Sequence, residues 1–190
     1  MARKKTDRAS WSDVKTTIAG LDPTELIKLI GDLYRLSKSN KDFLHARFSV
    51  GEDPLKPYKQ IIQDAMYPDV MRDKPIGISR GKRAISDYSK AVGDIRGEAE
   101  LMVFFAECGN RFTVDFGDID ENFYDALLHM YARAVDKVLE LPEPEQGELR
   151  ERLHDIVTSS SGIGWGYHDG VVDLYYGAFP DDEQPASVMQ

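Results

Sequence analysis

The stretch LMVFFAEC, residues 101–108, decides the fold of this 190-residue chain. All of its side chains except that of Glu107 are apolar, and at 100° per residue they cover most of the circumference of a helix. A helix that is apolar on all sides lies buried in the middle of a domain. A buried strand is the competing interpretation of so short an apolar run, but Ala99, Glu100 and Glu107 favour a helix from Glu98 to Cys108.

Helix signals flank this stretch on both sides. The run Asp22-Pro23-Thr24-Glu25 combines an N-cap residue, a proline at the first helical position and the spacing of a capping box, and so starts a helix. Other patterns of caps and helical periodicity predict helices near Trp11, from Ser39 or Asn40, around Tyr58 to Met66, from Ser79, from Asp120, around Leu149 to Val157 and around Val171 to Tyr175.

These signals predict an all-α protein, because the sequence contains no hairpin signal and no internal repeat. We expect a single compact domain of about nine helices over residues 10–179, built around one buried central helix. A basic tail at residues 1–9 and an acidic tail at residues 180–190 flank it.

Composition limits the classes of protein to which the chain can belong. With 42% hydrophobic and 30% charged residues, it can bury a core without metals or disulfides. The one cysteine, Cys108, excludes an internal disulfide and a multi-cysteine zinc site. The longest apolar run is too short to span a bilayer, and residues 1–8 lack the apolar segment of a signal peptide. We therefore expect a cytoplasmic protein without a membrane partner.

Charge is distributed unequally along the chain. Residues 1–95 hold 18 basic and 13 acidic residues, a net of +5, whereas residues 96–190 hold 6 and 20, a net of −14. The overall charge of −9 argues against a nucleic-acid-binding protein, which normally shows a dominant basic field. The acidic half is suited to attracting a basic protein partner, although ordinary solvated helix faces also explain the pattern.

A cluster of cations marks the expected helix start at Ser79. The run Gly77 to Arg83 lacks the spacing and the preceding strand of a phosphate-binding loop. Arg80, Lys82 and Arg83 nevertheless form a candidate anion-binding site, because a helix N-terminus attracts anions. A solvated basic helix start is the alternative interpretation.

Histidines and the aspartates that follow two of them supply the candidate metal ligands. Two His-Asp pairs and one further histidine make up this set, which consists of His129, His154, Asp155, His168 and Asp169. Such residues hold divalent metals in helical phosphohydrolases, so a metal-dependent hydrolase of phosphate esters is one hypothesis. The sequence contains no second Glu-x-x-His motif and no nucleophile elbow, which favours a non-catalytic protein without a cofactor.

The segment SGIGWGYHDG, residues 161–170, alternates glycines with aromatic and polar residues. Because interior glycines destabilise a helix, one helix is expected to end near Ser160 and the next to begin near Tyr167. We expect Trp165 and His168 to lie in or beside the largest concave surface, where these helices meet. The candidate binding residues are Trp165, Tyr167, His168, Asp169 and Tyr175. The alternative is that Trp165 is buried and fills the core.

Four stretches of the chain resemble a family of small uncharacterised bacterial proteins. They are KDFLHARF (41–48), KRAISDYSK (82–90), LMVFFAECGNRFTVDFGDIDENFYDAL (101–127) and GIGWGYHDGVVDLYY (162–176), and the likeness extends from about Asp22 to Tyr176. This family is a domain of unknown function, so the resemblance implies a helical, cytoplasmic, bacterial protein and no activity or substrate.

The sequence thus leaves two hypotheses about function. The leading one is a non-catalytic interaction or accessory module that binds a protein partner through charge attraction and an aromatic anchor. The alternative is the metal-dependent hydrolase.

Overall fold

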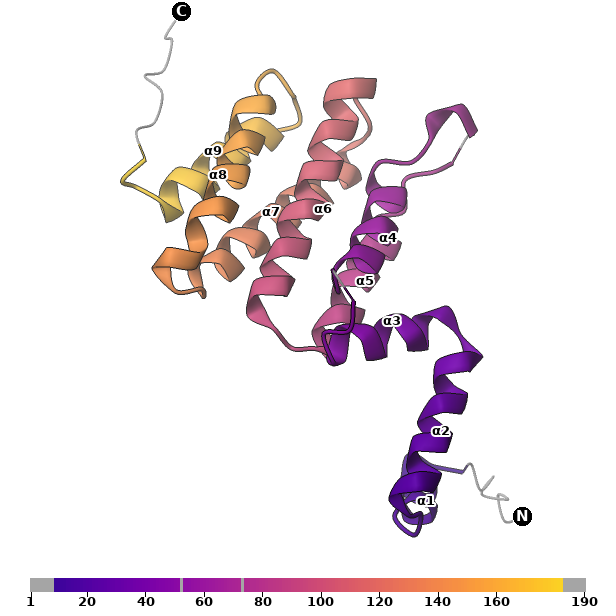
Figure 1. The fold of residues 1–190 in the computed structure, drawn as a ribbon. Coiled ribbons are helices and arrows are strands. Elements are labelled where there is room, and N and C mark those ends of the chain that lie inside the picture. The colour runs from indigo at the N-terminus through magenta and orange to yellow at the C-terminus, as the bar shows by residue number, and fades with distance from the viewer. Residues whose placement is uncertain (1–8, 52, 73, 183–190) are drawn as a thin grey trace, which may run out of the picture. The chain divides into compact units, whose positions relative to one another are not determined.

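A computed structural model describes residues 9–51, 53–72 and 74–182, which form nine α-helices, one 3₁₀ turn and no strand (Figure 1). The predicted all-α class is therefore confirmed. Most of the predicted tails, residues 1–8 and 183–190, lies outside these ranges. None of the helices within them is both long and apolar enough to cross a membrane.

The chain divides into two compact units, residues 1–44 and 45–190, and the predicted domain span of 10–179 covers parts of both. The first unit contains α1 (Trp11–Ile18), α2 (Pro23–Leu36) and most of α3 (Lys38–Arg47). The predicted start of α2 is confirmed, because the Asp22 carboxylate accepts the Glu25 backbone N–H at 2.9 Å. α3 begins at Lys38, before the predicted start, because the Ser37 hydroxyl already accepts the N–H of Asn40 at 3.1 Å.

The second unit contains six further helices, with α6 at their centre (Figure 1). In chain order these are α4 (Lys56–Met66), α5 (Ile78–Ala91), α6 (Ile95–Phe116), α7 (Glu121–Leu139), α8 (Glu143–Ser159) and α9 (Tyr167–Ala178), with the 3₁₀ turn η1 (Val70–Arg72) between α4 and α5. α6 packs against α4, α5, α7 and α8, and α9 packs against α7 and α8. The buried side chains of these helices form one continuous core.

The central helix is buried, as the apolar stretch predicts. Leu101, Val103, Phe105 and Ala106 are fully buried. α6 is longer than the predicted span from Glu98 to Cys108, because Gly109 lets α7 approach closely and does not end the helix. A Cβ atom at Gly109 would lie only 2.6 Å from a methyl group of Leu127 on α7.

Candidate functional site

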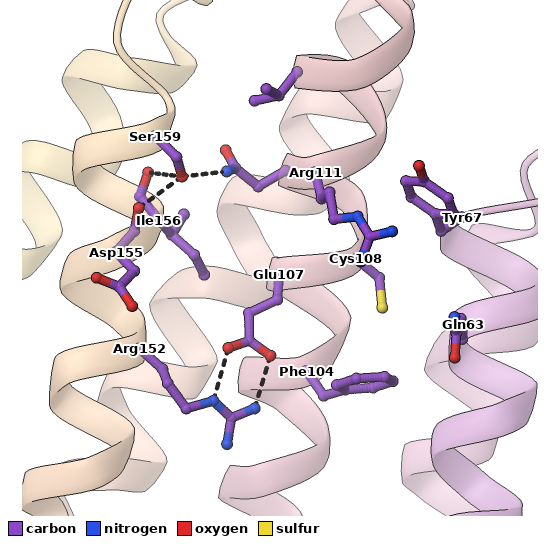
Figure 2. Close-up of a pocket in the computed structure, with 12 residues that line it drawn as sticks. Gln63, Tyr67, Phe104, Glu107, Cys108, Arg111, Arg152, Asp155, Ile156 and Ser159 are labelled. Atoms are coloured by element: carbon purple, nitrogen blue, oxygen red, sulfur yellow. Dashed lines mark hydrogen bonds and ion pairs between the residues drawn. The ribbon is translucent and has the colours of Figure 1, made fainter.

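A groove of about 620 Å³ lies over α6, between α4 and α8. Figure 2 shows Phe104 and Glu107 of α6 between Arg152 of α8 on one side and Gln63 of α4 on the other. The groove forms because α4 and α8 both pack along α6 and leave the strip of α6 between them uncovered. Its volume lies in the range of pockets that bind ligands.

The apolar surface of the groove comes mainly from α6. Phe104, Cys108 and Val114 contribute from this helix, and Ile156 contributes from α8. Burial, aided by the negative charge of Glu107, raises the pKa of the Cys108 thiol to about 12. The thiol is therefore protonated at neutral pH and is a small apolar wall group rather than a nucleophile.

An ion-pair network that includes two lining residues of the groove joins three helices. Arg152 of α8 donates two hydrogen bonds of 2.7 Å to the Glu107 carboxylate and one of 2.7 Å to Glu100, both on α6. Lys59 of α4 lies 2.7 Å from the other oxygen of Glu100. Burial by itself would raise the pKa of Glu100, but hydrogen bonds and charge from Arg152 and Lys59 outweigh it and hold the pKa below its ordinary value.

Asn110 places one unsatisfied acceptor in the wall of the groove. The Ser159 hydroxyl donates to the Asp155 carbonyl at 2.6 Å, so it must accept from the Asn110 amide nitrogen, which lies 2.8 Å away. This chain of bonds fixes the orientation of the amide, and within the described part of the chain it leaves Oδ1 buried without a hydrogen-bond partner. A bound donor can satisfy this oxygen after a small side-chain shift, which makes Asn110 a polar anchor point in an apolar groove.

Two oppositely charged side chains stand on the open side of the groove. Arg111 of α6 is exposed, and its guanidinium lies 4.5 Å from the centre of the Tyr67 ring. Tyr67 in turn donates a hydrogen bond of 2.6 Å to Asp115, which holds the ring in place. Asp155, near the C-terminal end of α8, presents an exposed carboxylate. The groove therefore offers an apolar surface between a cation and an anion.

The sequence places Trp165 and His168 in or beside the largest concave surface, but the groove over α6 includes neither of them. The predicted end of α8 near Ser160 and start of α9 at Tyr167 are both confirmed. However, turn bonds from Ile163 N–H to Ser160 and from Tyr167 N–H to Gly164 fold the glycine segment tightly, and neither Trp165 nor His168 lines the groove. Trp165 is 57% exposed and donates to Asp118 at 3.2 Å, so the alternative of a buried Trp165 is wrong.

Two of the predicted contact aromatics are buried. Tyr167 and Tyr175 are each 1% exposed, because they lie on the side of α9 that packs against α7 and α8. Tyr175 also donates a hydrogen bond to Asp182. They are core residues and cannot anchor a partner, whereas Asp169 is exposed on the same helix.

The cations of the candidate anion site lie in the first two turns of α5. α5 begins at Ile78 with Gly77 as its N-cap, so Ser79 lies inside the helix and the prediction that it caps is wrong. Arg80 and Arg83 are exposed, Lys82 is half-buried, and Arg83 lies 3.8 Å from Asp87 one turn further along.

The candidate metal ligands are held by other partners or lie apart. His154 Nε2 lies 3.2 Å from the Tyr176 hydroxyl, and His168 Nδ1 lies 2.8 Å from the Ser160 hydroxyl. His129 is exposed on α7. Across residues 9–51, 53–72 and 74–182, no three His, Cys, Asp or Glu side chains form a group that could hold a metal ion. The hydrolase hypothesis therefore gains no support here.

Sequence reasoning did not identify the groove, although one signal was available. Glu100 and Glu107 are separated by seven residues in an otherwise apolar stretch, so they share one face of the helix. Such a pair of carboxylates indicates that this face meets cations from neighbouring helices.

Comparison with known proteins leaves the chain without an assigned relative. No protein-family model, curated protein or solved structure matches it. The resemblance to the family of small bacterial proteins therefore stays a prediction.

The exposed position of Trp165 leads to a stability prediction. We expect Trp165→Ala to lower the free energy of unfolding by less than about 1 kcal/mol, as for other surface substitutions. Urea denaturation followed by circular dichroism measures this change. A loss of about 3 kcal/mol, the size typical of a deleted core aromatic, would place the indole in the core.

The buried hydroxyl of Tyr167 leads to a second prediction. This hydroxyl has no hydrogen-bond partner among the described residues, so Tyr167→Phe should leave the free energy of unfolding unchanged or raise it by up to about 1 kcal/mol. The matched control is Tyr131→Phe, which removes a hydrogen bond of 3.0 Å to the Leu153 carbonyl and should lose about 1 kcal/mol. Equal losses in the two variants, measured by thermal unfolding, would mean that the Tyr167 hydroxyl has a partner.

Proposed function

We propose that this chain is a non-catalytic protein-interaction module that holds a short segment of a partner protein in the groove over α6. The observation that supports the proposal is the apolar strip between two flanking helices, which extends from Phe104 to Val114. Ten residues of helix correspond to about 15 Å, enough for three turns of a bound helix. Amphipathic helices commonly bind in grooves of this kind by placing apolar side chains at successive turns.

The charges around the groove favour a segment that is basic as well as apolar. Residues 96–190 carry a net charge of −14, and Asp155 presents an exposed carboxylate in the groove itself. Complementary charge accelerates association and excludes acidic competitors. The proposed partner segment is therefore an amphipathic stretch with apolar anchors on one side and lysine or arginine on the other.

The chemistry of the lining residues supports binding rather than catalysis. The Cys108 thiol is protonated at neutral pH, and the Glu107 carboxylate is held in two hydrogen bonds by Arg152. A nucleophile needs an adjacent base or a lowered pKa, and neither is present at this thiol.

Selection from a displayed library of random twelve-residue peptides tests the proposal. We expect the purified protein to enrich basic, amphipathic peptides, whose affinity is then measured by fluorescence polarisation. Val114→Arg places a long cation in the groove at a position that is 52% exposed, so it should weaken binding at least about tenfold without unfolding the chain.

The matched control is Leu139→Arg. Leu139 is 46% exposed on α7 and does not line the groove, so this variant should bind the selected peptides as the parent protein does. If no peptide is enriched, or if Val114→Arg binds the peptides as tightly as Leu139→Arg, the groove is not the binding site.

A further inference from the structure

The lining of the groove over α6 contains one charge that the protein itself does not balance. Among the described residues, four charged side chains line the groove, and three of them have a partner of opposite charge. Arg152 donates to Glu107 at 2.7 Å, and Arg111 lies 3.5 Å from Asp115. The carboxylate of Asp155 has no hydrogen-bond or ion-pair partner in the described part of the chain. This unbalanced negative charge favours a cation on the bound segment.

The groove also contains an acceptor without a donor. Asn110 is 4% exposed, and its Oδ1 has no hydrogen-bond partner among the described residues. The bond from the amide nitrogen to Ser159 holds the side chain so that it offers an acceptor to the groove and not a donor. A buried acceptor without a partner costs free energy, which a donor from a ligand recovers. The complementary ligand group is therefore an N–H or O–H donor.

These two groups lie close together although they belong to different helices. The Asn110 amide nitrogen lies 2.8 Å from the Ser159 hydroxyl, which lies 2.6 Å from the Asp155 carbonyl. Asp155 and Ser159 are four residues apart on α8, so their side chains lie one turn apart on the same face of this helix (Figure 2). One side chain of a bound segment can therefore reach both Asp155 and Asn110.

Arginine is the side chain whose chemistry matches both acceptors. Its guanidinium group carries five N–H donors in one plane and stays charged at neutral pH. It is also more weakly hydrated than the ammonium group of lysine, so it loses less hydration on entering an apolar site. This difference matters here because Cys108, Val114 and Ile156 form apolar walls of the same groove.

We infer that Asn110 and Asp155 form a subsite for an arginine side chain of the segment that binds over α6. The guanidinium donates to the Asp155 carboxylate and, after a small shift of the Asn110 side chain, to Oδ1 of the amide. The methylene groups of the arginine contact the apolar walls. The inference rests on the proposed function, because it names the side chain by which the groove selects its partner segment.

The peptides selected on the parent protein are the probe for this subsite. We expect the selected twelve-residue peptides to share one arginine at a constant distance from their apolar anchors. Replacement of this arginine by citrulline keeps the shape of the side chain but removes its charge. It should weaken binding at least about tenfold in fluorescence polarisation, as expected for the loss of a charge-assisted hydrogen bond.

Asp155→Asn tests the same contact from the protein side. Asp155 is exposed and its carboxylate has no partner among the described residues, so this variant should fold as the parent does. It should weaken binding of the arginine peptide at least about tenfold and leave the affinity for the citrulline peptide unchanged, because both changes remove one interaction. The matched control is Asp125→Asn on the exposed side of α7, which changes the net charge equally and should bind both peptides as the parent does.

Asn110→Ala tests the second acceptor. It should weaken binding of the arginine peptide at least about fivefold and leave unchanged the affinity for the same peptide with norleucine in place of arginine. Circular dichroism shows whether the variant folds. Equal affinity of the parent and a folded Asn110→Ala for the arginine peptide would remove Asn110 from the subsite and contradict the inference.

The outcomes separate this inference from the proposed function. If peptides are selected and lose affinity in Val114→Arg but share no arginine, the groove binds a segment and the arginine subsite does not exist. The same conclusion follows if Asp155→Asn binds the arginine peptide as tightly as Asp125→Asn does, or if the effects of Asp155→Asn and citrulline multiply. If no peptide is enriched at all, the proposed function and this inference are both wrong.

Discussion

Arg152→Met will lower the free energy of unfolding by about 3 to 5 kcal/mol at neutral pH, the range for breaking a buried ion pair. The substitution removes the cation that joins Glu107 and Glu100, and the Glu100 side chain is only 10% exposed. Lys59 then faces Glu100 alone, and the Glu107 carboxylate loses both of its hydrogen bonds from Arg152. Urea denaturation at pH 7 measures the loss.

The pH dependence of this loss distinguishes the ion pair from packing. Arg152 and Lys59 hold the pKa of Glu100 in the folded protein below its pKa in the unfolded chain. The stability that ionised Glu100 contributes is therefore present at pH values above the pKa of the unfolded chain. It is lost as the pH falls through the pKa of the folded protein. The difference between the parent chain and Arg152→Met should therefore shrink on acidification below about pH 4, where carboxylates become protonated.

The control for this experiment is Arg133→Met on the exposed side of α7, which should change the free energy of unfolding by no more than about 0.5 kcal/mol. A loss in Arg152→Met that is smaller than about 1 kcal/mol, or that stays constant with pH, would contradict the assigned role of the network.

Phe105→Ala will lower the free energy of unfolding by about 3 to 5 kcal/mol, as is usual for deletion of a buried aromatic ring. Phe105 is fully buried, and it packs so closely on α5 that a Cβ at Gly81 would lie 2.7 Å from its ring. Alanine leaves a cavity there that the surrounding helices cannot fill. Thermal and urea unfolding both measure this loss.

The neighbouring residue provides the matched comparison. Phe104 is half-buried and lines the groove, so Phe104→Ala should lose only about 1 to 2 kcal/mol while weakening peptide binding. Equal losses of stability in the two variants would show that α6 is covered on all sides and that the groove is closed.

Local signals in the sequence predicted the helices well. The Asp22 and Asp120 caps begin α2 and α7, and the glycine segment separates α8 from α9 at the expected residues. These features depend on residues no more than a few positions apart, because capping bonds and helical periodicity are interactions within one or two turns. The cap of α5 was assigned to Ser79 instead of Gly77, because Gly77 caps the helix through its backbone and not through a side chain.

The candidate site could not be predicted in the same way. Trp165, Tyr167 and Tyr175 all belong to one aromatic region of the sequence, yet Trp165 is exposed and the two tyrosines are buried. The packing of α9 on α7 and α8 decides this difference, and a sequence pattern of one segment contains no information about its neighbours.

The sequence by itself determined that this protein is all-helical, where most of its helices begin and end, and that the helix containing residues 101–106 lies at the centre of its core. Only the tertiary structure decided that Phe104 lines a groove while Phe105 is enclosed, and that Arg152 pairs with Glu107 in that groove. Arg152 and Glu100 are 52 residues apart in sequence, so their contact depends on how α8 and α6 pack. Local sequence fixes each helix, whereas the uncovered strip of α6 results from the distance between two helices that pack beside it.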